Sequence, residues 1–129
     1  MTWPNFFLPG CPPDTAVADT LTVYRLVENV PPNADDFKSH KEKKPGKNYR
    51  ECSAFAVSVF TDIRDAKNAR ETISKRRENV DMKIAKGTTN PNKGVVLQSH
   101  NSSHVDYWIH EGFIVHGEFV VIAEGAERS

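Results

Sequence analysis

The segment 21–27 constrains the fold most strongly, because it alternates like a β-strand and carries an arginine in its middle. A period of two places Arg25 on the same face as Val23 and Val27. A buried guanidinium without a partner costs several kcal/mol. The sequence therefore predicts that Arg25 snorkels to the surface, pairs with a neighbouring acid, or grips an anion such as phosphate in a cleft of the sheet.

The rest of the chain reads as further short strands and two helices. Strands are expected at 54–60, 82–85, 95–97, 104–110, 113–115 and 119–122. A short helix begins after the cap Asn33, and a longer one begins after the cap Asp62. Segment 54–60 is apolar on both faces except for Ser58, which predicts a central strand. We therefore expect an α+β fold, a mostly antiparallel twisted sheet of five to seven short strands with two helices.

A chain of 129 residues suits one domain. We expect a proline-rich N-terminal arm at 1–18, a single α+β domain at 19–124 and a polar tail at 125–129, with the aromatic residues of the arm docked on the domain. Neither a secretory signal nor a membrane-spanning stretch is visible in the sequence, which predicts a cytoplasmic protein without membrane contact. Two cysteines, Cys11 and Cys52, are too few for a disulfide framework or a cysteine-based zinc site.

The charge balance argues against nucleic acid as the main partner. Seventeen Lys and Arg residues balance seventeen Asp and Glu residues, whereas phosphate contacts usually leave a basic excess. Basic runs occur at 38–50 and 70–86, but acidic residues interleave both, which favours a solvated surface. A net charge near zero also reduces self-repulsion, so we expect association with a protein partner or a homo-oligomer.

Three histidines and one aspartate form the most suggestive polar cluster: His100, His104, His110 and Asp106. Imidazole and carboxylate groups can ligate zinc, and an imidazole can also act as an acid or base. His104 and Asp106 would be neighbours on one strand face and His100 could fold back to them, but His110 would lie about 20 Å from His104 along the strand. The chain has no helical zinc motif, nucleophile elbow, phosphate loop or dinucleotide fingerprint. Loop histidines are the more ordinary interpretation, so we predict no metal.

Two segments carry a resemblance to a known family. Tyr24-Arg25 in a first strand, followed later by Ser58-Val59-Phe60-Thr61 in a strand that leads into a helix, resembles the ADP-ribosyltransferase fold over 21–122. In that family an early-strand Arg or His, a serine in a second strand and a late-strand acid line the NAD cleft. The resemblance implies an enzyme in which Arg25 grips the cofactor phosphates while Ser58 shapes the pocket. The chain also resembles small bacterial proteins to which no chemistry is assigned.

Balanced charge, missing catalytic motifs and the aromatic residues of the arm and of 107–113 favour a small soluble binding module over an enzyme. We expect it to act with a protein partner and without a cofactor. Trp108 with Tyr107 and Phe113 would form either a stacking platform for a base or peptide, or part of the core. The candidate ligand-binding residues are Arg25, Ser58, Phe60, Tyr107 and Trp108. The first alternative is an ADP-ribosyltransferase-like enzyme that binds NAD, and the second is a nucleic-acid-binding accessory protein that uses 43–50.

Overall fold

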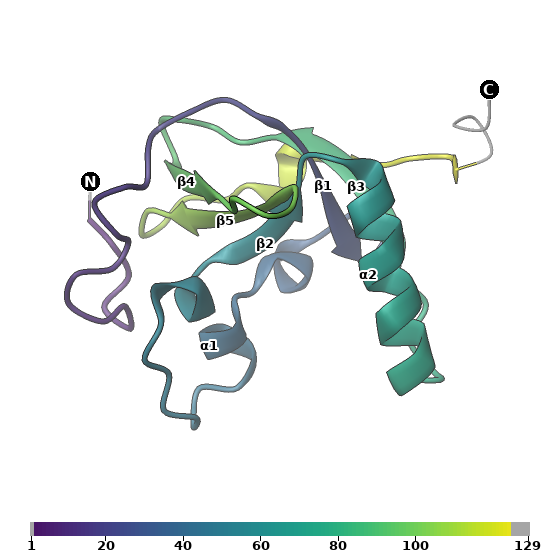
Figure 1. Cartoon of the computed structure of the whole chain (residues 1–129), viewed down its shortest axis with the longest axis horizontal. Helices are drawn as coiled ribbons and strands as arrows, with labels where there is room; N and C mark the ends of the chain where they lie inside the picture. Colours follow the sequence, from purple (N-terminus) through teal and green to yellow (C-terminus); the bar gives the residue numbers. More distant parts are fainter. Residues whose placement is uncertain (1, 125–129) are drawn as a thin grey trace.

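The computed structural model describes residues 2–124, which build one six-stranded sheet in the order β4-β5-β2-β1-β3-β6 (Figure 1). The strands are β1 (Thr22–Val27), β2 (Val57–Phe60), β3 (Lys83–Thr88), β4 (Gly94–Gln98), β5 (His104–Ile109) and β6 (Phe119–Val121). Every neighbouring pair is antiparallel. The α+β class and the expected strand number are confirmed, and the strand that contains Ser58 is central as predicted. The tail predicted at 125–129 lies outside the described residues.

Helices and short 3-10 turns complete the structure. They are η1 (Ala34–Phe37), α1 (His40–Lys43), η2 (Cys52–Phe55), α2 (Ile63–Arg76) and η3 (His116–Glu118). Asp62 caps α2 as predicted, since its side chain accepts a hydrogen bond from the main-chain nitrogen of Arg64. The single helix predicted after Asn33 is wrong in detail. The segment forms two short helices, η1 and α1, because a second capping box at Ser39 begins a new helix after η1 has ended.

The strand predicted at 113–115 is wrong. Strand β5 pairs with β4 on one side and with β2 on the other, so neither of its edges is free to accept a returning hairpin strand. The chain instead turns after β5, where Gly112 adopts a φ of +83°. Residues 113–115 then run as a loop.

The sheet is covered on both faces. On the face that carries Arg25, the buried cluster unites the sheet with Phe37 of η1 and with Val115. On the opposite face, α2 covers β1 and β3, and the N-terminal arm with η2 covers the end of the sheet at β4 and β5 (Figure 1). Residues from three distant parts of the sequence therefore enclose one sheet.

Arg25 lies within the apolar layer, as the alternation predicts. Its side chain is buried, Nε donates to the main-chain oxygen of Asp36 at 3.0 Å, and Nη1 donates to the main-chain oxygen of Ser58 at 2.7 Å. Its guanidinium carbon lies 5.7 Å from the centre of the Phe37 ring. Burial lowers the pKa of Arg25 to about 10, against an opposing effect of the Asp36 carboxylate, so the group stays charged at neutral pH. Arg25 thus ties η1 to the two central strands through main-chain oxygens rather than through an acidic side chain.

The carboxylate of Asp36 holds the segment that precedes η1. It accepts hydrogen bonds from the main-chain nitrogens of Glu28 and Asn33 and from the side chain of Asn29, at 2.7, 3.0 and 3.1 Å. Burial alone would raise the pKa of Asp36, but these hydrogen bonds outweigh it and bring the pKa below its ordinary value. The position of Phe37 is therefore fixed from both sides, by Asp36 and by Arg25.

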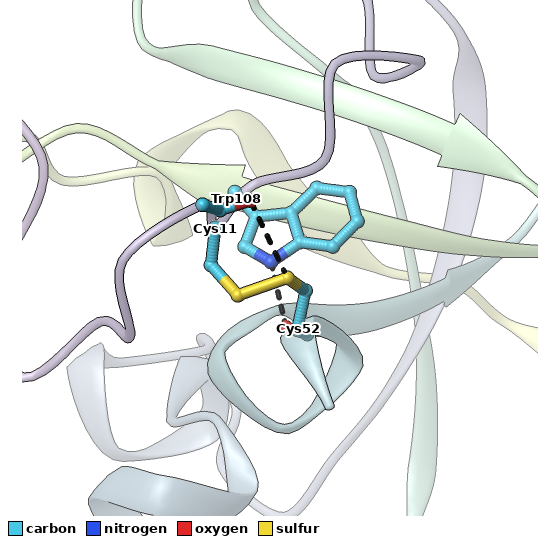
Figure 2. Close-up of a disulfide and its surroundings, with 4 residues drawn as sticks. Cys11, Cys52 and Trp108 are labelled. Atoms are coloured by element: carbon cyan, nitrogen blue, oxygen red, sulfur yellow. Dashed lines mark hydrogen bonds between the residues drawn. A yellow bond between two sulfur atoms is a disulfide. The ribbon is translucent and has the colours of Figure 1, made fainter. Parts of the chain in front are cut away.

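The N-terminal arm docks on the domain, as expected. Trp3, Phe6 and Phe7 pack in a cluster with Phe55 and Trp108, and the main chain of Val17 pairs with that of Val96. A disulfide joins Cys11 of the arm to Cys52 of η2 (Figure 2). The sequence, with only two cysteines, did not indicate a disulfide framework. The two cysteines are 41 residues apart, so no local sequence pattern predicts that they pair.

Trp108 belongs to the core. It is 1% exposed, and its Nε1 donates to the main-chain oxygen of Cys52 at 2.8 Å (Figure 2). Tyr107, its neighbour in β5, points to the opposite face and is also 1% exposed. The predicted stacking platform of Tyr107 and Trp108 is therefore wrong, and the core alternative holds for Trp108.

We expect Arg25→Met to lower the free energy of unfolding by about 2–4 kcal/mol, because it leaves the main-chain oxygens of Asp36 and Ser58 without this donor. Urea denaturation followed by circular dichroism measures the change. Lys75→Met on the exposed side of α2 is the matched control and should leave the midpoint unchanged. An Arg25→Met protein as stable as the wild type would contradict the structural role of Arg25.

Replacing Cys11 and Cys52 together by serine should lower the free energy of unfolding by about 2–4 kcal/mol, because the unfolded chain gains the freedom of a long loop. Denaturation with and without a reductant measures the loss, and the reductant should affect only the wild type. Alkylation of the unreduced, unfolded wild type should label no thiol. Two labelled thiols would show that the bridge does not form.

Candidate functional site

A pocket of about 270 Å³ opens on the face of the sheet that carries Arg25. Its floor consists of Val57 from β2 and of Tyr107 and Ile109 from β5. Its walls come from η1, α1, η2, the N-terminal arm and the loop 110–116. The fold thus brings five separate segments around one hollow in the sheet surface.

Aromatic rings dominate the pocket. Six of its lining residues are Phe or Tyr: Phe6, Phe7, Phe37, Phe55, Tyr107 and Phe113. The hydroxyl of Tyr107 accepts a hydrogen bond from the main-chain nitrogen of Asn90 at 3.0 Å, which fixes its ring. Burial raises the pKa of Tyr107, so this hydroxyl stays neutral. The pocket is therefore lined mainly by uncharged aromatic side chains, of which Phe37, Phe55 and Tyr107 are buried and Phe113 is exposed.

The charged groups of the pocket are acidic. Glu42 and Glu111 line it, and none of its lining residues is Lys or Arg in the part of the chain that the structure describes. His110 and His116 also line it. Burial lowers the pKa of His110, which leaves this imidazole uncharged at neutral pH. Glu42 and Glu111 are therefore the charged side chains among the described lining residues, and they stand beside several aromatic rings.

His110 is held by stacking rather than by polar contacts of its ring. Its ring centre lies 4.0 Å from that of Trp3 in a stacked arrangement, and 6.3 Å from that of Phe113. Its Nδ1 atom is buried without a hydrogen-bond partner among residues 2–124. A ligand with a hydrogen-bond donor could satisfy this atom, since buried polar groups are nearly always paired in native structures.

The loop 110–116 is anchored at both ends. The main-chain nitrogen of Glu111 donates to Thr2 of the arm at 2.8 Å. Nζ of Lys93 donates to the main-chain oxygen of Ile114 at 2.8 Å and pairs with Glu118 at 3.0 Å. In this loop Phe113 and Ile114 are 40% and 62% exposed. The loop thus presents apolar side chains to solvent beside the pocket.

The sequence-predicted site residues do not gather at one place. Tyr107 lines the pocket, Arg25 lies behind its Phe37 wall, and Trp108 is buried under the arm. Ser58 and Phe60 point to the opposite face of the sheet, where Phe60 packs with the α2 cluster. The side chains of Arg25 and Ser58 therefore line no common cleft, although the ADP-ribosyltransferase resemblance places them in one.

The predicted histidine cluster separates in the same way. His100 is exposed in the loop that precedes β5, and His110 lies at the pocket. His104 and Asp106 share the face of Ser58, as predicted, and Nε2 of His104 lies 3.1 Å from Oγ of Ser58. Within residues 2–124 no group of three or more His, Cys, Asp and Glu side chains is arranged to hold a metal ion.

Most of the pocket could not be found from the sequence. Phe6 and Phe7 are visible there only as aromatic residues of the arm, and nothing links Glu42, His110 or Phe37 to a common site. One sequence signal could have indicated the pocket. Aromatic residues are concentrated in the N-terminal arm, between β1 and β2, and in the loop after β5, which the sheet brings together.

Comparisons with known proteins give no relative. No family model, curated protein or solved structure significantly matches the chain. Among residues 2–124 no helix is long and apolar enough to cross a membrane. The function is therefore inferred from the geometry of the pocket.

We expect an NMR titration of the imidazole of His110 to give a pKa below the ordinary value of 6.5. Folding then favours the neutral ring, so the unfolded chain binds more protons below about pH 6.5 and the folded state loses stability there. Above that pH the ring contributes no pH dependence. The wild type should therefore lose more stability than His110→Gln between pH 7.5 and pH 5, and an inflection above 6.5 would contradict the burial of this ring.

Proposed function

We propose that this protein is a binding module that receives a cationic side chain with an apolar stem from a protein partner. One observation carries the proposal: the pocket combines six aromatic rings with two carboxylates and has no Lys or Arg among its described lining residues. Ring faces attract cations, and the attraction grows when the cation is desolvated. Glu42 and Glu111 add Coulombic attraction at the same place.

The size of the pocket supports one side chain rather than a large cofactor. Its volume of about 270 Å³ lies below the range of about 300–1,000 Å³ that is usual for small-molecule sites. A lysine side chain, methylated or not, is closer to this size than a dinucleotide such as NAD. The ADP-ribosyltransferase alternative is therefore the weaker proposal.

Exposed apolar residues beside the pocket support a protein as the source of that side chain. Phe113 and Ile114 project from the same loop that carries Glu111. Apolar side chains next to an anchoring pocket are typical of protein interfaces, where an apolar rim excludes water from the anchor.

The disulfide bears on where the protein acts. The cytoplasmic location expected from the sequence stays a prediction, and the bridge between Cys11 and Cys52 argues against it. Cytosolic thiols are kept reduced, whereas disulfides persist in oxidising compartments. An oxidising compartment suits the folded chain better.

The proposal is tested with three blocked tripeptides of the form Gly-X-Gly, in which X is trimethyllysine, norleucine or glutamate. In ¹H–¹⁵N NMR titrations the trimethyllysine peptide should bind most tightly, with shifts concentrated in 110–116, and the glutamate peptide should not bind. Phe113→Ala should weaken binding about fivefold, which corresponds to ~1 kcal/mol for an exposed cation–π contact. Val120→Ala, an exposed substitution on β6, is the control and should change nothing.

Two outcomes would overturn this function. Equal binding of the norleucine and trimethyllysine peptides would show that the pocket does not select a cation. Shifts that spare 110–116, or the absence of any binding, would show that the pocket is not the recognition site.

A further inference from the structure

A second polar group lies on the opposite face of the sheet from the pocket. Ser58 of β2 pairs in register with Asp106 of β5, and Phe60 pairs with His104, so all four side chains point to one face. Nε2 of His104 lies 3.1 Å from Oγ of Ser58 and 3.7 Å from Oδ1 of Asp106. The edge of Phe60 packs against the imidazole, with ring centres 5.7 Å apart, and helps to fix its orientation.

The arrangement is not that of a catalytic triad. In a triad the serine approaches one ring nitrogen and the carboxylate holds the other, so that the three groups lie in series. Here both Ser58 and Asp106 approach the same nitrogen of His104. The hydroxyl and the carboxylate thus both lie beside one imidazole nitrogen instead of on either side of the ring.

The distances between the donors suit one metal ion. Nitrogen and oxygen ligands lie about 2.0–2.2 Å from zinc, which separates two ligands of a tetrahedral site by about 3.3–3.6 Å. The observed separations of 3.1 and 3.7 Å bracket this value.

One oxygen of this group makes no hydrogen bond among residues 2–124, although the imidazole of His104 lies 3.7 Å from it. Oδ1 of Asp106 is buried and accepts no hydrogen bond from any described residue. A buried carboxylate oxygen without a partner is costly, and a bound ion removes that cost by coordinating the oxygen. The side chain of His104 is 32% exposed, so an ion and its remaining waters can reach the site from solvent.

We propose that His104, Asp106 and Ser58 bind a divalent transition-metal ion of the zinc class. Nε2 of His104 and Oδ1 of Asp106 are the principal ligands, Oγ of Ser58 is a third, and water completes the coordination. This site shares no residue with the pocket, so its test is independent of the proposed function.

The test titrates metal-free, disulfide-intact protein with Zn²⁺ in a calorimeter and with Co²⁺ in a visible absorption measurement, which reports tetrahedral coordination. The expected result is one ion per chain with a Kd tighter than about 1 mM. His104→Ala and Asp106→Asn should each weaken binding at least tenfold, and Ser58→Ala less. His100→Ala, an exposed histidine in the neighbouring loop, should leave binding unchanged.

Urea denaturation of each variant separates a lost ligand from a lost fold. The proposal is overturned if the wild type binds neither ion, or if folded His104→Ala binds Zn²⁺ as tightly as the wild type. It is also overturned if His100→Ala abolishes binding while Asp106→Asn does not, because the ion would then lie in the loop.

Discussion

The buried guanidinium of Arg25 is the interaction on which the rest of the structure depends. A charged group in the middle of an apolar strand must be satisfied where it lies, and it finds the main-chain oxygens of Asp36 and Ser58. These bonds hold η1 against the central strands and place the Phe37 ring over the sheet. Phe37 in turn forms one wall of the aromatic pocket. Arg25, which looked most like a ligand-binding group in the sequence, therefore acts on the pocket through the side chain of Phe37.

The N-terminal arm closes the pocket from the other side. Phe6 and Phe7 reach the pocket because the disulfide and the Trp108 cluster fix the arm across the end of the sheet. Thr2 then binds the main chain of the loop that carries Phe113. Arg25 and the disulfide thus hold opposite walls of one cavity. A loss of either interaction should disturb the shape of the pocket as well as stability.

Much of the fold could be predicted from the sequence, because it rests on local patterns. The alternation of 21–27 placed Arg25 in an apolar layer, the apolar run ending at Phe60 indicated a central strand, and Asp62 marked the start of α2. The prediction of a strand at 113–115 was wrong because the sequence does not show that β5 already pairs with a strand on each side. The disulfide could not be predicted for the same kind of reason, since it joins two cysteines that only the folded sheet brings together.

The candidate site was less accessible to sequence reasoning. Tyr107 and Trp108 are adjacent in the sequence but point to opposite faces of a strand, so they could not form one platform. His104, Asp106 and Ser58 converge only through the register of β2 and β5. The walls of the pocket are assembled from five segments, and nothing in the sequence joins Glu42 and Glu111, its two acidic lining residues.

The central claim is that a cation enters the aromatic pocket held between Arg25 and the arm. Intermolecular nuclear Overhauser effects between the methyl protons of bound trimethyllysine peptide and the protein test it most directly. The structure predicts contacts with the ring protons of Phe113, Phe6 and Tyr107. Contacts confined to other surfaces, or methyl groups that contact no ring, would contradict it.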